Sequence, residues 1–141
     1  MNIDRHIKDL IFQLGLSVVY CEDMDSNGHY IELIDVIAIK SGLNELDEQL
    51  TLLHEIGHAC KHKGQTELYN LAFSLHSKLE NEAEMFMIEK LIPFYLDQVD
   101  KELVNWLHFM ETYKINMKYE YVVRSLLSYY ADSPQFRSFI N

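Results

Sequence analysis

Apolar residues in the first part of the 141-residue chain recur at two different spacings. Over residues 3–14 they fall three or four positions apart, which predicts a helix, and Gly15 follows as a natural stop. Residues 16–21 carry β-branched and aromatic side chains, which are typical of a strand. The pattern therefore predicts a helix and then a strand.

A hairpin is predicted next. Asn27-Gly28 marks a turn, and residues 30–33 and 36–39 predict two short strands joined by a tight connection. A single long bent strand would show a similar pattern, so this alternative stays open. The second strand leads into the next helical segment.

Helical spacing resumes over residues 46–62 and ends at Gly64. One side of this helix is apolar and is expected to face the core, because apolar residues recur there at every turn. The residues of this apolar side are Leu46, Leu50, Leu53, Ile56 and Cys60.

The rest of the chain is mainly helical in pattern. Residues 65–76 show no clear period and indicate a packed connection or a short helix. A helix over residues 77–92 is expected to end before Pro93, because the residue before a proline resists helical geometry. Two further helical patterns cover residues 99–113 and 119–130. These elements predict an α+β fold with an N-terminal helix, a short antiparallel sheet and a C-terminal helical pair.

The helix over residues 46–62 carries the pattern His54-Glu55-x-x-His58. On a helix the two imidazoles lie about 40° apart on one face, so they can share one metal ion. Zinc accepts neutral imidazole nitrogen, and Glu55 is predicted to act as the general base on a water at the metal. Gly57 leaves space beside the two histidines. The motif is expected to face outward, opposite the apolar side of its helix.

A catalytic zinc ion needs a third protein ligand and one open position. The next helix offers Glu80, which shares a face with Ala83 and Glu84, whereas Glu82 lies about 200° round the helix. Glu80 is the predicted third ligand, and Glu84 is predicted to orient an imidazole. The same acidic residues also suit an ordinary helix start, in which Ser77 and Glu80 form a capping box.

Three more side chains are candidates for the surroundings of the metal. His62 lies on the same broad face as His58, one turn further along the helix. It is predicted to contact the side chains that bind the metal, or a substrate. A direct ligand role for His62 competes with Glu80. Tyr69 and His76 are candidate hydrogen-bond donors to a transition state, and simple packing roles are the alternative.

Three segments carry motifs: His54-Glu55-Ile56-Gly57-His58-Ala59-Cys60-Lys61-His62, Glu80-Asn81-Glu82-Ala83-Glu84-Met85-Phe86 and Leu91-Ile92-Pro93. They resemble the ImmA/IrrE family of zinc metallopeptidases, which shows a His-Glu-Leu/Ile-Gly-His helix ending in another His, then Glu-x-x-Ala-x-x-Phe-Ala and Leu-x-x-Pro. The similarity covers roughly residues 1–95. Met87 departs from the pattern, because the family prefers Ala there.

The resemblance implies a small zincin-like domain over residues 1–141, with a catalytic core in residues 1–95 and a helical extension in residues 96–133. It implies a zinc-dependent endopeptidase whose substrate is a protein, namely a transcriptional repressor of a phage or mobile element. One alternative is a regulatory protein that keeps this fold and binds a repressor without cleaving it. A purely structural zinc site is less well supported, because Glu55 would then have no role.

The charge and the cysteine content limit which binding partners and which cellular compartment are expected for this protein. The formal net charge of −10 argues against a DNA-binding surface, because neutralising phosphates requires excess positive charge. Cys21 and Cys60 are too few for a disulfide framework, and Cys60 is expected to be a buried structural thiol. The N-terminal segment lacks the apolar core of a signal peptide, and no apolar run is long enough to span a bilayer. A cytoplasmic protein without membrane contact is therefore expected.

Overall fold

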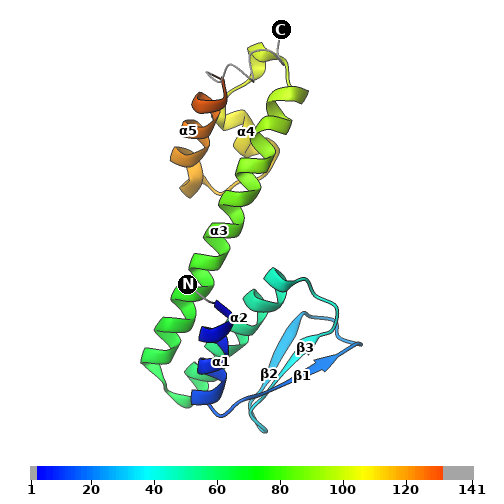
Figure 1. Cartoon of the computed structure of the whole chain (residues 1–141), viewed down its shortest axis with the longest axis vertical. Coiled ribbons are helices and arrows are strands. Elements are labelled where there is room, and N and C mark those ends of the chain that lie inside the picture. Colours follow the sequence, from blue (N-terminus) through cyan, green and yellow to red (C-terminus); the bar gives the residue numbers. More distant parts are fainter. Residues whose placement is uncertain (1–2, 132–141) are drawn as a thin grey trace. The chain divides into compact units, whose positions relative to one another are not determined.

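The computed structural model describes residues 3–131, and Figure 1 shows their helices and strands in chain order. The chain divides into two units, Met1–Asn81 and Glu82–Asn141. The mixture of helices with one small sheet confirms the predicted α+β class. The predicted single domain with its core in residues 1–95 stays a prediction, and the tail after Ser133 lies outside the described residues.

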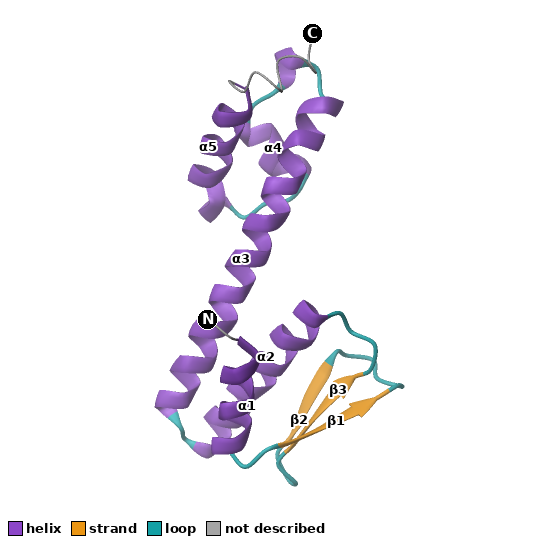
Figure 2. Ribbon diagram, viewed as in Figure 1, coloured by secondary structure: helices purple, strands orange, loops and turns teal. Residues whose placement is uncertain are grey.

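The first unit contains two helices and three strands before the long helix α3 begins (Figure 2). Their bounds agree with the predicted elements to within two residues, so these predictions are confirmed. The helices are α1 (Ile3–Gln13) and α2 (Glu45–Lys63), and the strands are β1 (Ser17–Cys21), β2 (Gly28–Ile31) and β3 (Val36–Lys40).

The sheet is mixed, which corrects the prediction of a short antiparallel sheet. Its strand order is β1-β3-β2, with β3 parallel to β1 and antiparallel to β2. The three central residues of β3, namely Ile37, Ala38 and Ile39, are all buried. A continuous apolar run of this kind suits a strand covered on both faces, and it therefore explains why β3 lies in the centre.

Local capping sets the ends of α2. At its start the Asn44 side chain accepts a hydrogen bond from the backbone N–H of Asp47 at 2.8 Å. At its end Gly64 takes the left-handed conformation with φ 68°, and its N–H reaches the carbonyls of Cys60 and Lys61. Asn44 supplies a side-chain acceptor and Gly64 tolerates a positive φ, so these two residues set the limits of the motif helix.

The buried side of α2 differs in part from the predicted stripe. Leu53, Ile56 and Cys60 are buried as expected, and burial raises the pKa of the Cys60 thiol. Leu46, in the first turn of α2, is exposed, and Leu50 is half-buried at the edge of the core. The helix packs against α1, β2 and β3 in the core of the first unit. The buried residues of α2 are Leu52, Leu53, Glu55, Ile56, Ala59 and Cys60.

Helix α3 (Thr66–Gln98) is much longer than predicted. The segment 65–76 had no clear period, yet from Thr66 on it is helical, and Pro93 lies inside the helix instead of ending it. A proline in a helix interior costs about 3 kcal/mol through a lost hydrogen bond and a clash. Ile92, Tyr95 and Leu96 around Pro93 are buried in the second unit, and burying such side chains stabilises by about 1.5–3 kcal/mol each. The free energy gained by burying these side chains therefore exceeds the cost of a proline inside the helix.

The second unit has its own hydrophobic core, built from the later part of α3 with α4 (Trp106–Thr112) and α5 (Glu120–Ala131). The helix predicted over residues 99–113 is shorter in the structure, because Asn105 caps α4 by accepting from the His108 N–H at 2.7 Å. Short 3-10 turns, Lys101–Leu103 and Met117–Tyr119, precede α4 and α5. Among residues 3–131, no helix combines the length and the apolar character that crossing a bilayer requires.

Close packing between β2 and α2 generates the first testable prediction. A Cβ at Gly28 would lie 2.4 Å from Cγ2 of Thr51 on α2 and 3.3 Å from the Ala38 carbonyl. Gly28→Ala is therefore expected to lower the free energy of unfolding by about 1–3 kcal/mol through overpacking. Denaturant unfolding measures this change.

The second substitution Thr51→Ser provides the control. It removes Cγ2 but keeps the hydroxyl that donates to the Asp47 carbonyl at 2.6 Å. Gly28→Ala combined with Thr51→Ser should regain part of the lost stability. Equal stability of Gly28→Ala and the unmodified protein would contradict the packing argument.

Candidate metal centre

His54 and His58 lie one helical turn apart on α2, and both side chains are exposed. Their Nε2 atoms are 3.2 Å apart, and the ring centroids are 4.8 Å apart at an interplanar angle of 83°. In a tetrahedral zinc site with Zn–N distances of about 2.0–2.1 Å, two nitrogens are roughly 3.3 Å apart. The imidazole pair therefore has the spacing that a shared zinc ion requires.

Glu55 completes the group of possible ligand atoms. Within residues 3–131, His54, Glu55 and His58 are the only cluster of three or more His, Cys, Asp or Glu side chains whose candidate ligand atoms all lie within 4.8 Å of one another. Two imidazoles suit zinc, and the Glu55 carboxylate beside them is placed as the predicted base. The structure thus brings together the three residues of the predicted His-Glu-x-x-His motif.

Glu55 is buried, although the motif was predicted to face outward as a whole. Its side chain is only 8% exposed, and its Oε2 accepts a hydrogen bond from the backbone N–H of Tyr30 on β2 at 2.9 Å. Leu52 and Ala59, one turn before and after Glu55, are both buried. This apolar flank was the signal in the sequence that could have shown the burial of Glu55.

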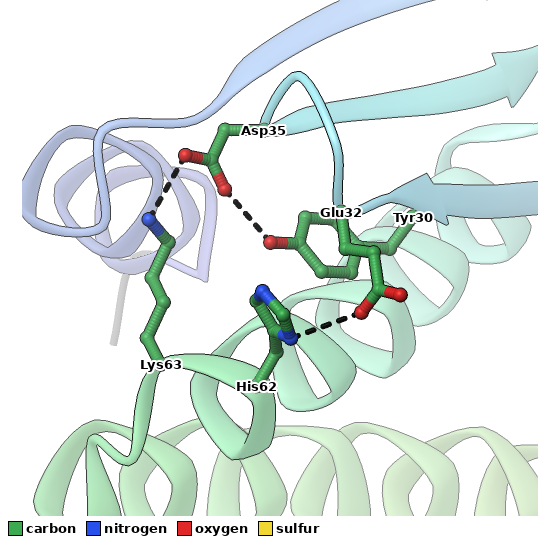
Figure 3. A network of polar contacts seen from close by, with 5 residues as sticks. All are labelled: Tyr30, Glu32, Asp35, His62 and Lys63. Carbon is green, nitrogen blue, oxygen red and sulfur yellow. Dashed lines mark hydrogen bonds and ion pairs between the residues drawn. The ribbon is translucent and has the colours of Figure 1, made fainter.

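The side chain of Tyr30 is itself fixed by a polar network (Figure 3). Its hydroxyl donates to Oδ1 of Asp35 at 2.8 Å, and Nζ of Lys63 lies 3.1 Å from Oδ2 of the same carboxylate. Burial and the Asp35 contact raise the pKa of Tyr30 to about 12, while the Tyr30 hydroxyl and then Lys63 lower the pKa of Asp35. Asp35 has φ 54°, a left-handed conformation that Asp adopts more readily than most residues.

The network ties the β2–β3 turn to the last turn of α2. Lys63 belongs to α2, Asp35 to the turn and Tyr30 to β2, so the three side chains join elements that are distant in sequence. Because the Tyr30 N–H holds Glu55, whatever fixes Tyr30 also fixes the carboxylate. Sequence reasoning missed Tyr30, Asp35 and Lys63, since none of them stands within a motif.

An open groove of about 520 Å³ lies between β2 and the motif helix. The predicted residue His62 lines this groove, where its Nδ1 lies 2.9 Å from a carboxylate oxygen of Glu32 (Figure 3). The two side chains are 49% and 66% exposed, so this contact contributes little to stability. His62 is not part of the ligand group. The groove is lined by His29, Tyr30, Ile31, Glu32, Leu33, Glu55, His58 and His62.

A second cavity, of about 220 Å³, lies between α2 and the first part of α3. The two predicted cleft residues Tyr69 and His76 both line it, and the His76 ring centroid is 6.1 Å from that of His54. Their predicted role as transition-state donors stays a prediction. The full lining is Leu53, His54, Gly57, His58, Lys61, Tyr69, Phe73 and His76.

Glu80 does not join the imidazole pair in this structure. Its carboxylate is exposed and lies 3.7 Å from Nδ1 of His76, one turn earlier on α3. Side chains on a helix lean toward its N-terminus, so Glu80 leans toward the level of His76 and His54. Its role as third ligand stays a prediction. Glu84 belongs to the second unit, and its predicted contact with an imidazole also stays a prediction.

Comparison with known proteins identifies the family to which this chain belongs. A family model described as Peptidase M78, IrrE N-terminal-like domain, matches residues 12–119. This match confirms the resemblance that was drawn from the motifs. Searches of curated proteins and of solved structures gave no match to this chain.

The link between Tyr30 and Glu55 generates the second prediction. Tyr30→Phe keeps the buried ring and the backbone N–H but removes the hydroxyl that donates a hydrogen bond to Asp35. We expect a loss of roughly 1–2 kcal/mol in unfolding free energy and exchange of the residue-30 amide hydrogen about tenfold faster. Denaturant unfolding and amide exchange followed by NMR measure the two effects.

Tyr121→Phe is the matched control, because Tyr121 is 81% exposed. It should change neither quantity. An unchanged exchange rate at residue 30 in Tyr30→Phe would show that the network does not fix the N–H that holds Glu55.

Proposed function

Because the chain belongs to the M78 peptidase family, we propose that it is a zinc-dependent endopeptidase that hydrolyses a specific protein partner. The observation that carries this proposal is the 3.2 Å separation of the His54 and His58 Nε2 atoms, with the Glu55 carboxylate in the same group. An open groove beside these residues offers room for an extended polypeptide. Together they supply a metal site, a base and access for a substrate.

The side chains would divide the chemistry between them. His54 and His58 would hold the ion, with Glu80 as the third ligand. A bound zinc ion would act as a Lewis acid that polarises the scissile carbonyl and lowers the pKa of the attacking water. Glu55 takes the proton from the attacking water and delivers it to the leaving amine. The Tyr30 N–H, 2.9 Å from Oε2, holds this carboxylate in place during both transfers.

The partner that we propose is a transcriptional repressor of a phage or mobile element, cleaved at one site in the cytoplasm. This choice rests on the resemblance to the ImmA/IrrE family. The net charge of −10 supports a protein partner over direct binding of nucleic acid. Glu32 and Glu55 add acidic groups to the groove.

One observation favours a second candidate function. Glu80 lies outside the group of His54, Glu55 and His58, so only two imidazoles and the general base gather there. A protein that binds a repressor without cleaving it needs no third ligand. Cleavage of a partner by the zinc-loaded protein distinguishes the enzyme from this binding protein.

The base is tested by Glu55→Gln. This change keeps the shape of the side chain and its ability to accept from Tyr30, but it removes the proton acceptor. We expect cleavage to fall by at least about a hundredfold, while zinc content per chain stays the same. A pooled peptide library with mass-spectrometric detection measures cleavage, and atomic absorption measures zinc. A fully active Glu55→Gln protein would rule out the proposed mechanism.

The third ligand is tested by comparing two neighbouring carboxylates. Glu80→Ala is expected to weaken zinc affinity about tenfold or more, whereas Glu82→Ala, on the opposite side of α3, should leave it nearly unchanged. Competition with a chromogenic chelator measures both affinities. Weaker binding in Glu82→Ala than in Glu80→Ala would reverse the assignment.

A further inference from the structure

We propose that Glu32, in the groove along β2, makes the protein select partners that carry a lysine or arginine side chain close to the cleaved bond. This inference rests on the proposed function, because it needs a metal ion at the imidazole pair and a polypeptide in the groove. It adds a charge class to the substrate and assigns the selection to one residue. Glu32 determines specificity in this way and takes no part in the hydrolysis itself.

The position of Glu32 relative to the imidazole pair follows from the two walls of the groove. On the strand side, Glu32 lies two residues beyond Tyr30, whose N–H holds the general base. Successive residues of a strand rise by about 3.3 Å, so these two positions are roughly 6.6 Å apart. On the helix side, the contact partner His62 lies one turn, or about 5.4 Å, beyond His58. Both walls place the Glu32 carboxylate within reach of a substrate side chain near the scissile bond.

The groove contains carboxylates and imidazoles but no permanent cation. Among the described residues that line it, two are acidic, three are histidines and none is lysine or arginine. The Glu55 carboxylate already accepts a hydrogen bond from the backbone of β2. Lys63, close by on α2, pairs with Asp35 instead, with its Nζ 3.1 Å from Oδ2. Glu32 is therefore the carboxylate of the groove that a cationic side chain of the substrate can bind.

The present partner of Glu32 is one that a substrate can replace. Nδ1 of His62 lies 2.9 Å from Oε2 of Glu32, and both side chains are well exposed to solvent. An imidazole is charged only when it is protonated, whereas lysine and arginine stay charged at neutral pH. Arginine can also bind both oxygens of a carboxylate at once. A basic side chain in the groove therefore gives Glu32 a stronger partner than a neutral imidazole does.

The backbone that carries Glu32 is held on both sides (Figure 3). Tyr30 and Asp35, which flank it in sequence, are joined by a hydrogen bond of 2.8 Å, and Lys63 connects Asp35 to α2. A carboxylate on a fixed turn loses little conformational freedom when it binds a cation, so more of the attraction contributes to affinity. An acidic side chain at the same place would be repelled by Glu32.

Small hydroxamates test this selection without requiring peptide cleavage. Hexanohydroxamate chelates zinc and serves as the neutral reference, and two analogues carry an ammonium or a carboxylate group at the far end of the chain. These chains are long enough to span one helical turn, about 5.4 Å, from the metal site towards Glu32. Calorimetric titration of the zinc-loaded full chain should give a Kd about fivefold lower for the ammonium compound than for the reference. The carboxylate compound should bind more weakly than the reference.

Removal and reversal of the charge assign the effect to Glu32. Glu32→Gln should abolish the preference for the ammonium compound, and Glu32→Lys should reverse it, so that the carboxylate compound binds more tightly. Neither change should alter the Kd of hexanohydroxamate by more than about threefold. Glu22→Gln is the matched control, since Glu22 is an exposed acidic residue that does not line the groove. It should leave the preference intact.

Cleavage of the pooled peptide library gives a second measurement. Lysine and arginine should be enriched at one fixed position, about two residues from the cleaved bond, because that is the spacing between Tyr30 and Glu32 on the wall of the groove. Glu32→Gln should remove this enrichment. Cleaved peptides with no basic residue at a fixed position would contradict the selection.

The outcomes separate the two proposals. Zinc-loaded protein that binds hexanohydroxamate but does not prefer the ammonium compound overturns the selection by Glu32 and leaves the proposed metal centre in place. A preference that persists in Glu32→Gln, or that Glu22→Gln also removes, overturns the selection as well. Protein that binds none of the three compounds overturns the proposed metal centre, and the selection with it.

Discussion

The hydrogen bond from the Tyr30 N–H to Glu55 is the contact on which the arrangement of the site depends. Glu55 is almost fully buried, and a buried carboxylate is strongly destabilising unless hydrogen bonds satisfy it. Tyr30 belongs to β2, the edge strand beside β3, and an edge strand leaves main-chain groups without strand partners. This hydrogen bond therefore satisfies both the buried carboxylate of Glu55 and the backbone N–H of the edge strand. The same 2.9 Å bond joins the sheet to α2 and fixes the orientation of the Glu55 carboxylate.

The left-handed turn at Gly64 determines which residues lie beside the C-terminal half of the motif helix. It ends α2, and α3 begins at Thr66, so two long helices follow each other closely. Their packing brings Tyr69 to Lys61 and His76 to His54. The imidazole pair consequently has a helix-lined, aromatic space on one side and a strand-lined, polar groove on the other.

Local features of the fold could be predicted from the sequence, and features that depend on distant contacts could not. The spacing of His54 and His58 follows from helical geometry alone, and Gly64 ends α2 through its own conformational freedom. The Tyr30–Glu55 bond joins residues 25 positions apart, and no motif encodes it. The helix end predicted at Pro93 was wrong, because only the local preference of proline was considered. Burial of its neighbours in the second unit stabilises the helix through this position. The parallel pairing of β1 with β3 was missed for a similar reason, since the order of strands depends on which one is buried on both faces.

The unequal exposure of the three motif residues also argues against a closed structural zinc site. A closed structural zinc site gains nothing from exposed imidazoles, because its ligands are best protected from water and from competing ions. Here both imidazoles are exposed, and the carboxylate between them is held back in the protein by β2. The two imidazoles are thus reachable from solvent, while the Glu55 carboxylate is held by the Tyr30 N–H of β2. This division of exposure within five residues of one helix suits the hydrolysis that we propose, since the metal must be reachable and the proton acceptor must not move.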